Sequence, residues 1–200
     1  MTVIVALTGE YPCRQGAPVL RGVDTGIFHL RYFTHCMACG FCGDACCSFG
    51  VDIDLENVAR LRAAPQAFKD HVGVSEEEWF TSEIVDDAEF PAGRHVRSRV
   101  RDGACVFLDR AARGCKIHSY CLQNGLDYHL LKPMVSVLFP LTFEHGLLVP
   151  SGEVVDGSLV CASDGPTVYA GARNELLYYF GEGLVAELDA LSCSITAGSP

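Results

Sequence analysis

The sequence predicts an α+β fold built from short strands, a hairpin and helices. Three observations predict this class. Apolar segments rich in β-branched and aromatic residues occupy much of the first 35 positions, which favours strands. Apolar residues recur at helical spacing in residues 54–62 and 167–191. Between them, residues 104–117 have the pattern of two short strands joined by a polar loop.

In the N-terminal third, residues 3–7 and 27–33 predict strands. Leu55, Val58 and Leu61 follow at helical spacing, and Asp54 stands at the N-cap position, so we expect a helix over residues 54–62. Pro65 should end this helix or start the next turn.

The middle of the chain combines a helical segment with a hairpin. Ser75 and Glu78 have the spacing of a capping box, which predicts a helical segment through Trp79 and Phe80. Residues 104–108 then predict a strand that returns, through the loop 109–114, as residues 115–117. Cys105 and Cys115 would lie on adjacent strands. Such a pair can complete a metal site, although ordinary buried cysteines fit equally well.

The C-terminal third begins with a helical pattern over residues 118–131, which Pro133 interrupts. Residues 135–141 and 147–149 favour strand or extended core structure. The last segment, about 165–192, predicts one or two helices, because the following residues form an apolar stripe: Leu176, Leu177, Phe180, Leu184, Val185 and Leu188.

Length and composition favour one domain over residues 1–200, since a chain of 200 residues that is 49% hydrophobic can bury one continuous core. No apolar run reaches the roughly 20 residues that would span a bilayer. The first seven residues lack the basic start of a secretory signal. We therefore expect a cytoplasmic protein in a reducing compartment, with no membrane partner.

Charge limits the classes of partner. The formal net charge of −10 argues against nucleic-acid binding, which depends on Lys and Arg neutralising phosphates. In a strand, Arg97, Arg99 and Arg101 would share one face. This face is either a solvated surface balanced by the acidic residues 76–78 and 86–89, or a site for an anionic substrate or acidic partner.

Cysteine is the most informative residue type. Five cysteines fall within the twelve residues 36–47, and crowded thiolates repel one another unless a cation or a cluster neutralises them. The chain has 11 cysteines, an odd number. That number, the tight spacing and the missing signal favour metal ligation over disulfides.

The spacing from Cys36 through Cys39 and Cys42 to Cys46 matches the run with which bacterial ferredoxins bind cubane clusters. Ferredoxins continue with proline where this chain has Cys47, and the second such run of two-cluster ferredoxins is missing here. Two Cys-x2-Cys pairs would also suit tetrahedral zinc. Sulfur ligands indicate a soft metal and leave its identity open.

Four separated motifs together resemble the CxxCxxCC cysteine-cluster family, whose members are described as zinc- or iron-chelating proteins. The motifs occupy residues 36–47, 103–109, 114–118 and 132–140, so the resemblance covers about residues 30–145. It implies a metal-binding core over that stretch. The implied ligands are Cys36, Cys39, Cys42, Cys46, Cys47, Cys105 and Cys115.

Two departures from the family pattern change the ligand pool. The family's first motif is more compact, so residues 43–45 resemble an insertion, and which cysteines align is open. Ser136 stands where the family has a cysteine, and serine is a poorer soft-metal ligand than a thiolate. Cys121 is an additional thiol near the hairpin, and we expect it to be a ligand. For His118, ligation and an ordinary hydrogen-bonded ring are equally favoured.

The sequence thus predicts a cysteine-cluster protein that binds an iron–sulfur cluster, with 4Fe–4S favoured, or zinc, in a redox or modification pathway. Whether it is an enzyme is open. Some larger proteins with this cluster resemble lysine N-methylases, but residues 181–183 are weak evidence for a cofactor loop because no strand precedes them. A third hypothesis is a structural zinc module that presents the arginine strand to an acidic partner.

Overall fold

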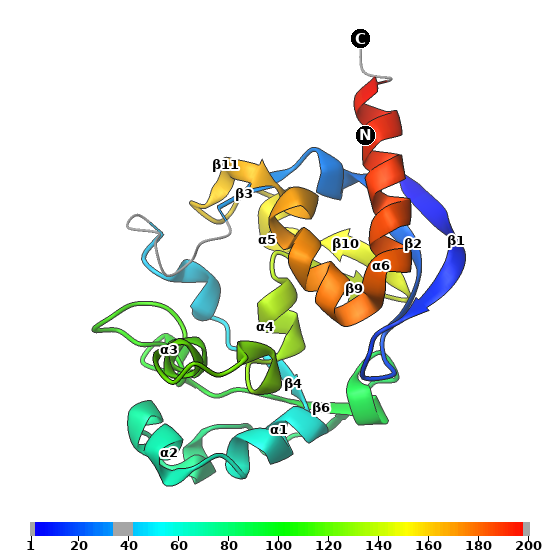
Figure 1. The fold of residues 1–200 in the computed structure, drawn as a ribbon. Helices are drawn as coiled ribbons and strands as arrows, with labels where there is room; N and C mark the ends of the chain where they lie inside the picture. Colours follow the sequence, from blue (N-terminus) through cyan, green and yellow to red (C-terminus); the bar gives the residue numbers. More distant parts are fainter. Residues whose placement is uncertain (1–2, 34–41, 198–200) are drawn as a thin grey trace. The chain divides into compact units, whose positions relative to one another are not determined.

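A computed structural model of the chain describes residues 3–33 and 42–197. The chain divides into two compact units, which we call unit 1 (Met1–Thr34 with Leu138–Pro200) and unit 2 (His35–Val137). Both contain helices and strands, which confirms the predicted α+β class (Figure 1). Unit 2 lies within the stretch of about residues 30–145 predicted to be the metal-binding core.

Unit 1 contains a four-stranded sheet in the order β1-β2-β10-β9. The central pair β2 and β10 is parallel, and both outer pairs are antiparallel. A second, two-stranded sheet pairs β3 with β11. The bounds of these elements, with the two short helices of unit 1, are β1 Ile4–Pro12, β2 Val19–Asp24, η1 Thr25–Phe28, β3 Arg31–Tyr32, β9 Leu141–Glu144, β10 Leu147–Pro150, α5 Gly152–Val155 and β11 Ala162–Thr167.

The strand predicted over residues 27–33 is only partly present. The carboxylate of Asp24 accepts a hydrogen bond from the Gly26 backbone N–H at 2.7 Å, and this cap starts the 3₁₀ helix η1. Only β3 at the end of the segment is extended. The local cap therefore outweighs the β preference of the side chains that follow it.

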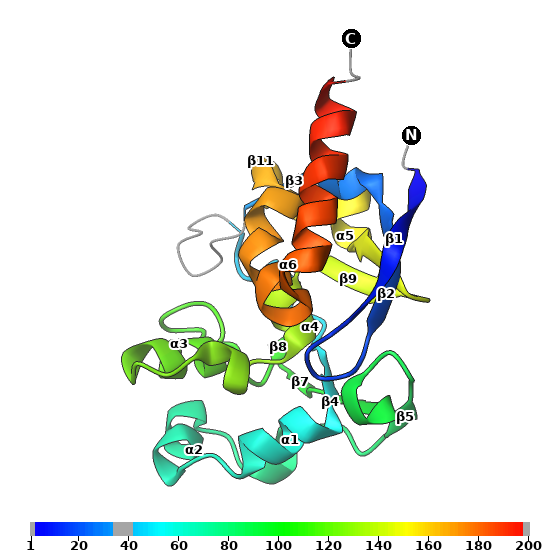
Figure 2. The same ribbon diagram turned by 45° about the vertical axis from the view of Figure 1, so that its right-hand side comes forward.

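The predicted C-terminal helices form α6 (Val168–Ala197), which is interrupted at Gly181 by a left-handed φ of 82°. The orange and red halves of α6 lie side by side in both views (Figures 1 and 2). Asp189 on the second half accepts hydrogen bonds from the Tyr169 hydroxyl at 2.6 Å and from Arg173 Nη2 at 2.6 Å on the first half. Gly181 therefore forms the turn between two helical segments of α6.

Unit 2 contains a three-stranded antiparallel sheet in the order β4-β6-β5 and a two-stranded hairpin of β7 and β8. Short helices surround them. The bounds are η3 Ala45–Cys47, β4 Asp52–Asp54, α1 Leu55–Arg62, α2 Gln66–Val72, η4 Glu76–Glu78, β5 Val85–Asp86, η5 Pro91–Gly93, β6 Arg94–Arg97, β7 Val100–Arg101, β8 Ala104–Cys105, α3 Lys116–Gln123 and η6 Tyr128–Leu130. Helix α4 (Met134–Leu138) lies at its C-terminal boundary.

The two predicted helix caps in unit 2 have opposite outcomes. Helix α1 begins as predicted, because the buried carboxylate of Asp54 accepts from the Asn57 backbone N–H at 2.7 Å. The capping box at Ser75 is wrong: its hydroxyl donates to the carboxylate of Glu77 and caps no backbone N–H. Only the single 3₁₀ turn η4 follows.

The hairpin over residues 104–117 is also shorter than predicted. Strand β8 pairs with β7, which precedes it, and residues 115–117 contribute one antiparallel bridge between Leu108 and Cys115. Lys116 already begins α3. Residues 135–138, the first part of the segment 135–141 predicted to be extended, lie in helix α4, since a short apolar run does not distinguish a helix from a buried strand.

The core of unit 2 is aromatic. Trp79 is fully buried, and its ring packs edge-on against Phe68 at 5.8 Å and Phe107 at 5.6 Å between centroids. Cys105 and Cys115 pack against this cluster from its margin. The core therefore supports the segments that carry the candidate ligands of the hairpin region.

We expect Asp54→Ala to lower the free energy of unfolding of unit 2 by about 1 kcal/mol, because it removes the cap of α1. Ser75→Ala is the matched control and should stay within about 0.5 kcal/mol of wild type, since its hydroxyl caps nothing. Urea unfolding monitored by Trp79 fluorescence measures both. Equal losses in the two variants would contradict the assignment of the caps.

The Asp189 contacts predict a pH dependence in unit 1. Hydrogen bonds from Arg173 and Tyr169 lower the pKa of Asp189 from 3.8 to about 2. The contribution of the ionised Asp189 to the free energy of unfolding is therefore present above the pKa of the unfolded state and is lost as the pH falls toward 2. Between about pH 5 and about pH 2.5, wild type should lose more stability than Asp189→Asn in urea unfolding. Parallel losses would contradict this linkage.

Candidate metal centre

The described part of the cysteine loop begins at Cys42, whose side chain is buried. Gly43 and Asp44 both have left-handed backbone angles, with φ of 59° and 57°, and they turn the chain into η3. Cys46 and Cys47 lie on this 3₁₀ turn and are half-buried. Cys36 and Cys39, the first two predicted ligands, lie outside the described residues.

Arg113 connects the loop to the hairpin region. Its Nη2 lies 3.4 Å from Cys42 Sγ and 3.3 Å from Asp44 Oδ1. Burial lowers the pKa of Arg113, but the hydrogen bonds and charges of Asp44 and Cys42 outweigh it and raise the pKa above its usual value. The guanidinium thus places a permanent positive charge beside a predicted ligand, two residues before Cys115.

The second group of predicted ligands is Cys105, Cys115 and Cys121. Burial raises the pKa of the Cys105 thiol, and the charge of Cys115 raises it further. Burial also raises the pKa of the Cys121 thiol, with added contributions from Cys115 and Asp127. Cys105 and Cys115 also pack against the same hydrophobic core cluster.

Backbone structure fixes two of these thiols. Cys115 occupies the N-cap position of α3, so the positive end of the helix dipole lies beside it. Cys105 Sγ lies 3.3 Å from the Ser98 hydroxyl, which also accepts from the Val51 backbone N–H at 2.9 Å. Ser98 is buried and so links the hairpin to the chain just before β4.

Among residues 3–33 and 42–197, no three Cys, His, Asp or Glu side chains gather closely enough to hold a metal ion. The described thiols supply the right chemistry for a soft metal, since sulfur ligands suit zinc and iron–sulfur centres. They form two groups, one on the loop and one around α3. Whether the predicted ligands complete one shell stays a prediction.

His118 lies on α3 between Cys115 and Cys121 in sequence. Its ring stacks on Tyr128 with centroids 4.6 Å apart, and its Nδ1 lies 3.4 Å from Lys132 Nζ. Tyr128 also stacks on His129. These contacts match the hydrogen-bonded ring that was the alternative to ligation.

The remaining cysteines belong to unit 1. Cys13 and Cys161 are buried, and Cys193 on α6 is exposed. No disulfide joins any two of the nine described cysteines. All eight candidate ligands, by contrast, belong to the range His35–Val137.

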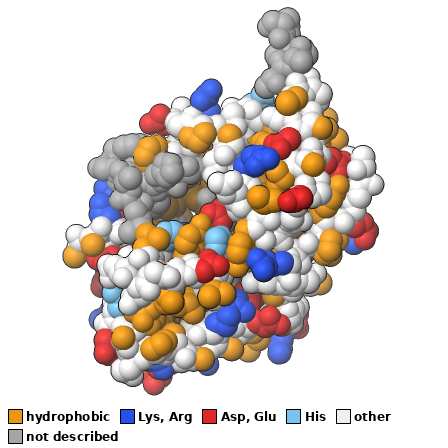
Figure 3. Space-filling view, viewed as in Figure 1, with side chains coloured by type: hydrophobic (Ala, Val, Ile, Leu, Met, Phe, Trp, Pro, Cys, Tyr) orange, Lys and Arg blue, Asp and Glu red, His pale blue; other side chains and the backbone are white. Residues whose placement is uncertain are grey.

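The arginine segment runs from β6 to β7, and its side chains contact groups elsewhere in unit 2. Arg97 Nη1 lies 2.8 Å from both carboxylate oxygens of Asp52, and Arg101 Nη1 lies 3.1 Å from Glu78 Oε2. Arg99 Nε donates to the Phe80 carbonyl at 2.7 Å. Figure 3 shows basic and acidic side chains interspersed over the face in view. These contacts favour a solvated surface over a site for an acidic partner.

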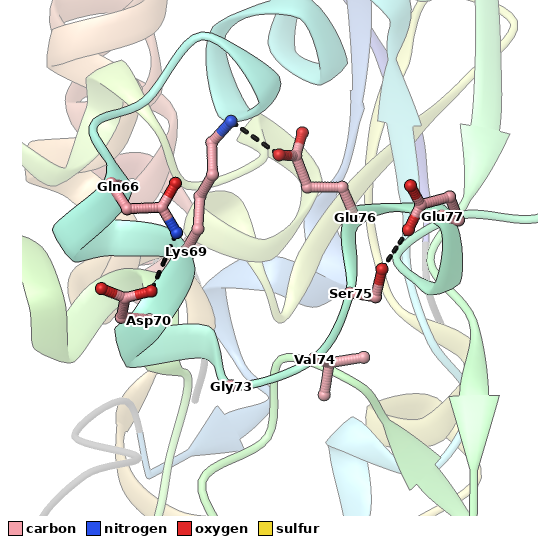
Figure 4. Close-up of a pocket in the computed structure, with 8 residues that line it drawn as sticks. All are labelled: Gln66, Lys69, Asp70, Gly73, Val74, Ser75, Glu76 and Glu77. Carbon is pink, nitrogen blue, oxygen red and sulfur yellow. Dashed lines mark hydrogen bonds and ion pairs between the residues drawn. The ribbon is translucent and has the colours of Figure 1, made fainter.

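A surface pocket of about 510 Å³ opens at the C-terminal end of α2. Figure 4 shows its polar side chains paired with one another, Lys69 with Glu76 at 2.6 Å and Gln66 with Asp70 at 2.9 Å. No candidate cysteine lines it. The pocket is therefore separate from the candidate metal centre.

Comparison with known protein families, curated proteins and solved structures finds no match for this chain. The resemblance to the cysteine-cluster family accordingly stays a prediction from the motifs. Within the described residues, no helix combines the length and the apolar character needed to cross a bilayer.

Sequence reasoning missed Arg113, Asp44 and Ser98, which contact predicted ligands. The local signals at these positions indicate turns: Gly43 precedes Asp44, and Gly114 follows Arg113. The contact between Arg113 and Cys42 spans 71 positions in sequence, so no local pattern could have identified it.

Burial predicts an order of thiol reactivity. Under native anaerobic conditions, iodoacetamide should modify exposed Cys193 well before Cys121, which has no exposed surface and a raised pKa. Peptide mass spectrometry over time measures the order, and unfolding in urea should equalise the two rates. Native labelling of Cys121 as fast as Cys193 would contradict the described burial.

Proposed function

We propose that the chain is a cysteine-cluster protein whose unit 2 binds an iron–sulfur cluster, with 4Fe–4S favoured, or zinc. The candidate ligands are drawn from the loop thiols Cys42, Cys46 and Cys47 and from Cys105, Cys115 and Cys121, with Cys36 and Cys39 included on sequence grounds. One observation carries the proposal: Cys105 and Cys115 pack against the same core cluster, and Arg113, two residues before Cys115, contacts Cys42 Sγ at 3.4 Å. Candidate thiols from the loop and from the hairpin region are therefore linked within unit 2.

The donor chemistry supports this proposal. A buried thiol that binds a metal must give up its proton, and the raised pKa values of Cys105 and Cys121 make that loss unfavourable without a cation. A metal ion or cluster supplies the missing positive charge. Binding should therefore stabilise unit 2, because a shared metal would link segments that are far apart in sequence.

The compartment follows from the same chemistry. The proposal requires reduced thiols, and no disulfide joins the described cysteines. We therefore place the protein in a reducing compartment, with the cytoplasm as the proposed location. A redox role would follow from an iron–sulfur cluster, and an architectural role from zinc.

Anaerobic purification of the full chain followed by elemental analysis tests the proposal. Stoichiometric zinc in a colourless protein, or iron with sulfide in a brown protein, is the expected result. Metal-free protein that is fully folded would contradict it.

A matched pair of buried thiols tests the ligand assignment. Cys121→Ala in unit 2 should lose most of the metal, whereas Cys161→Ala, a buried thiol of unit 1, should retain it. Circular dichroism verifies that both variants are folded. Equal metal contents in the two variants would remove Cys121 from the ligand set.

A further inference from the structure

Arg113 is placed in an unusual way for a surface-loop arginine. It adopts a left-handed backbone conformation with φ of 69°, in the loop that precedes α3. Its side chain is about 29% exposed, and the Asp44 side chain that it contacts is about 10% exposed. The ion pair is therefore largely withdrawn from water, where an unbalanced charge is costly.

The donors of Arg113 are only partly used. Both contacts to Cys42 and Asp44 are made by Nη2. Its Nε is buried and has no hydrogen-bond acceptor among the described residues. Because a buried donor without an acceptor is destabilising, this N–H favours an additional acceptor beside the guanidinium. Thiolate and sulfide are acceptors that a loaded metal centre would bring there.

We propose that Arg113 is a positioning residue of the metal centre, which holds Cys42 in place and offsets the negative charge of the bound thiolates. This inference rests on the proposed metal binding. A Zn²⁺ ion bound by four thiolates carries net negative charge, and so does a cubane cluster with the same ligands. A fixed guanidinium in contact with one of these sulfurs stabilises that charge, as charge-assisted hydrogen bonds do.

A variant of Asp44 distinguishes two roles of Arg113: its positive charge, and a purely structural link between the loop and the hairpin region. Arg113→Gln removes the positive charge, and we expect it to weaken metal binding about tenfold, as other outer-shell changes do. Asp44→Asn removes the competing negative charge but keeps an oxygen that can accept from Arg113. It should leave metal affinity unchanged or increase it. If Arg113 and Asp44 only linked the two segments, both variants would bind the metal more weakly.

The test uses the full chain, prepared anaerobically with wild type in parallel. If wild type contains zinc, competition for Zn²⁺ against a chromogenic chelator gives the affinities. If it contains an iron–sulfur cluster, the reduction potential is the readout. Loss of a cation disfavours the added electron, so Arg113→Gln should lower the potential and Asp44→Asn should not.

Two further variants complete the design. Arg113→Lys keeps the positive charge, so it should retain most of the metal affinity or reduction potential that Arg113→Gln loses. Arg110→Gln is the matched control, since Arg110 lies in the same loop and donates to the backbone carbonyl of Arg101 at 3.2 Å. It should match wild type.

The outcomes separate the two proposals. Wild type that is folded and binds no metal overturns the proposed function and this inference together. Metal-loaded wild type with an unchanged Arg113→Gln variant overturns this inference alone, as does an equal weakening in Arg113→Gln and Asp44→Asn. Weaker metal binding or a lower potential in Arg113→Gln, together with an Asp44→Asn variant that is unchanged or changed in the opposite direction, supports it.

Discussion

A buried sulfur stays ionised only where positive charge lies beside it, because removing an anion from water is costly in an apolar core. This constraint governs unit 2. Cys105 is half-buried and Cys121 is fully buried, and removal from water raises the pKa of both thiols. In the loop, Cys42 contacts the guanidinium of Arg113. The thiolate forms of Cys105 and Cys121 are thus disfavoured, whereas Cys42 lies beside a positive charge.

The hydrophobic core of unit 2 supports the segments that carry Cys105 and Cys115. Phe107 packs against Trp79 in that core, and its carbonyl accepts from the Lys116 backbone N–H at 2.7 Å. That bond fixes the start of α3, and with it Cys115 at the helix N-terminus. Packing of hydrophobic residues therefore helps to determine where Cys105 and Cys115 lie.

How far the sequence predicts this structure depends on the range of the interactions. Asp54 caps α1 as predicted because the carboxylate and the N–H that it binds are three residues apart. Ser75 has the same kind of signal, but Glu77 competes for its hydroxyl. Where the local pattern fits both states, as in residues 135–138, sequence does not separate strand from helix, and part of a segment predicted to be extended forms α4.

The candidate site shows the same division. Cysteine spacing predicts the loop thiols as ligands and the soft-metal chemistry that they would share. It does not identify Arg113, which reaches Cys42 only through the fold. Residues 43–45 supply the left-handed turn and the carboxylate of Asp44. This carboxylate is the anion that holds Arg113 against the loop. A shorter loop without Asp44 would lack this contact, so the turn at residues 43–45 and the placement of Arg113 belong to one structural feature.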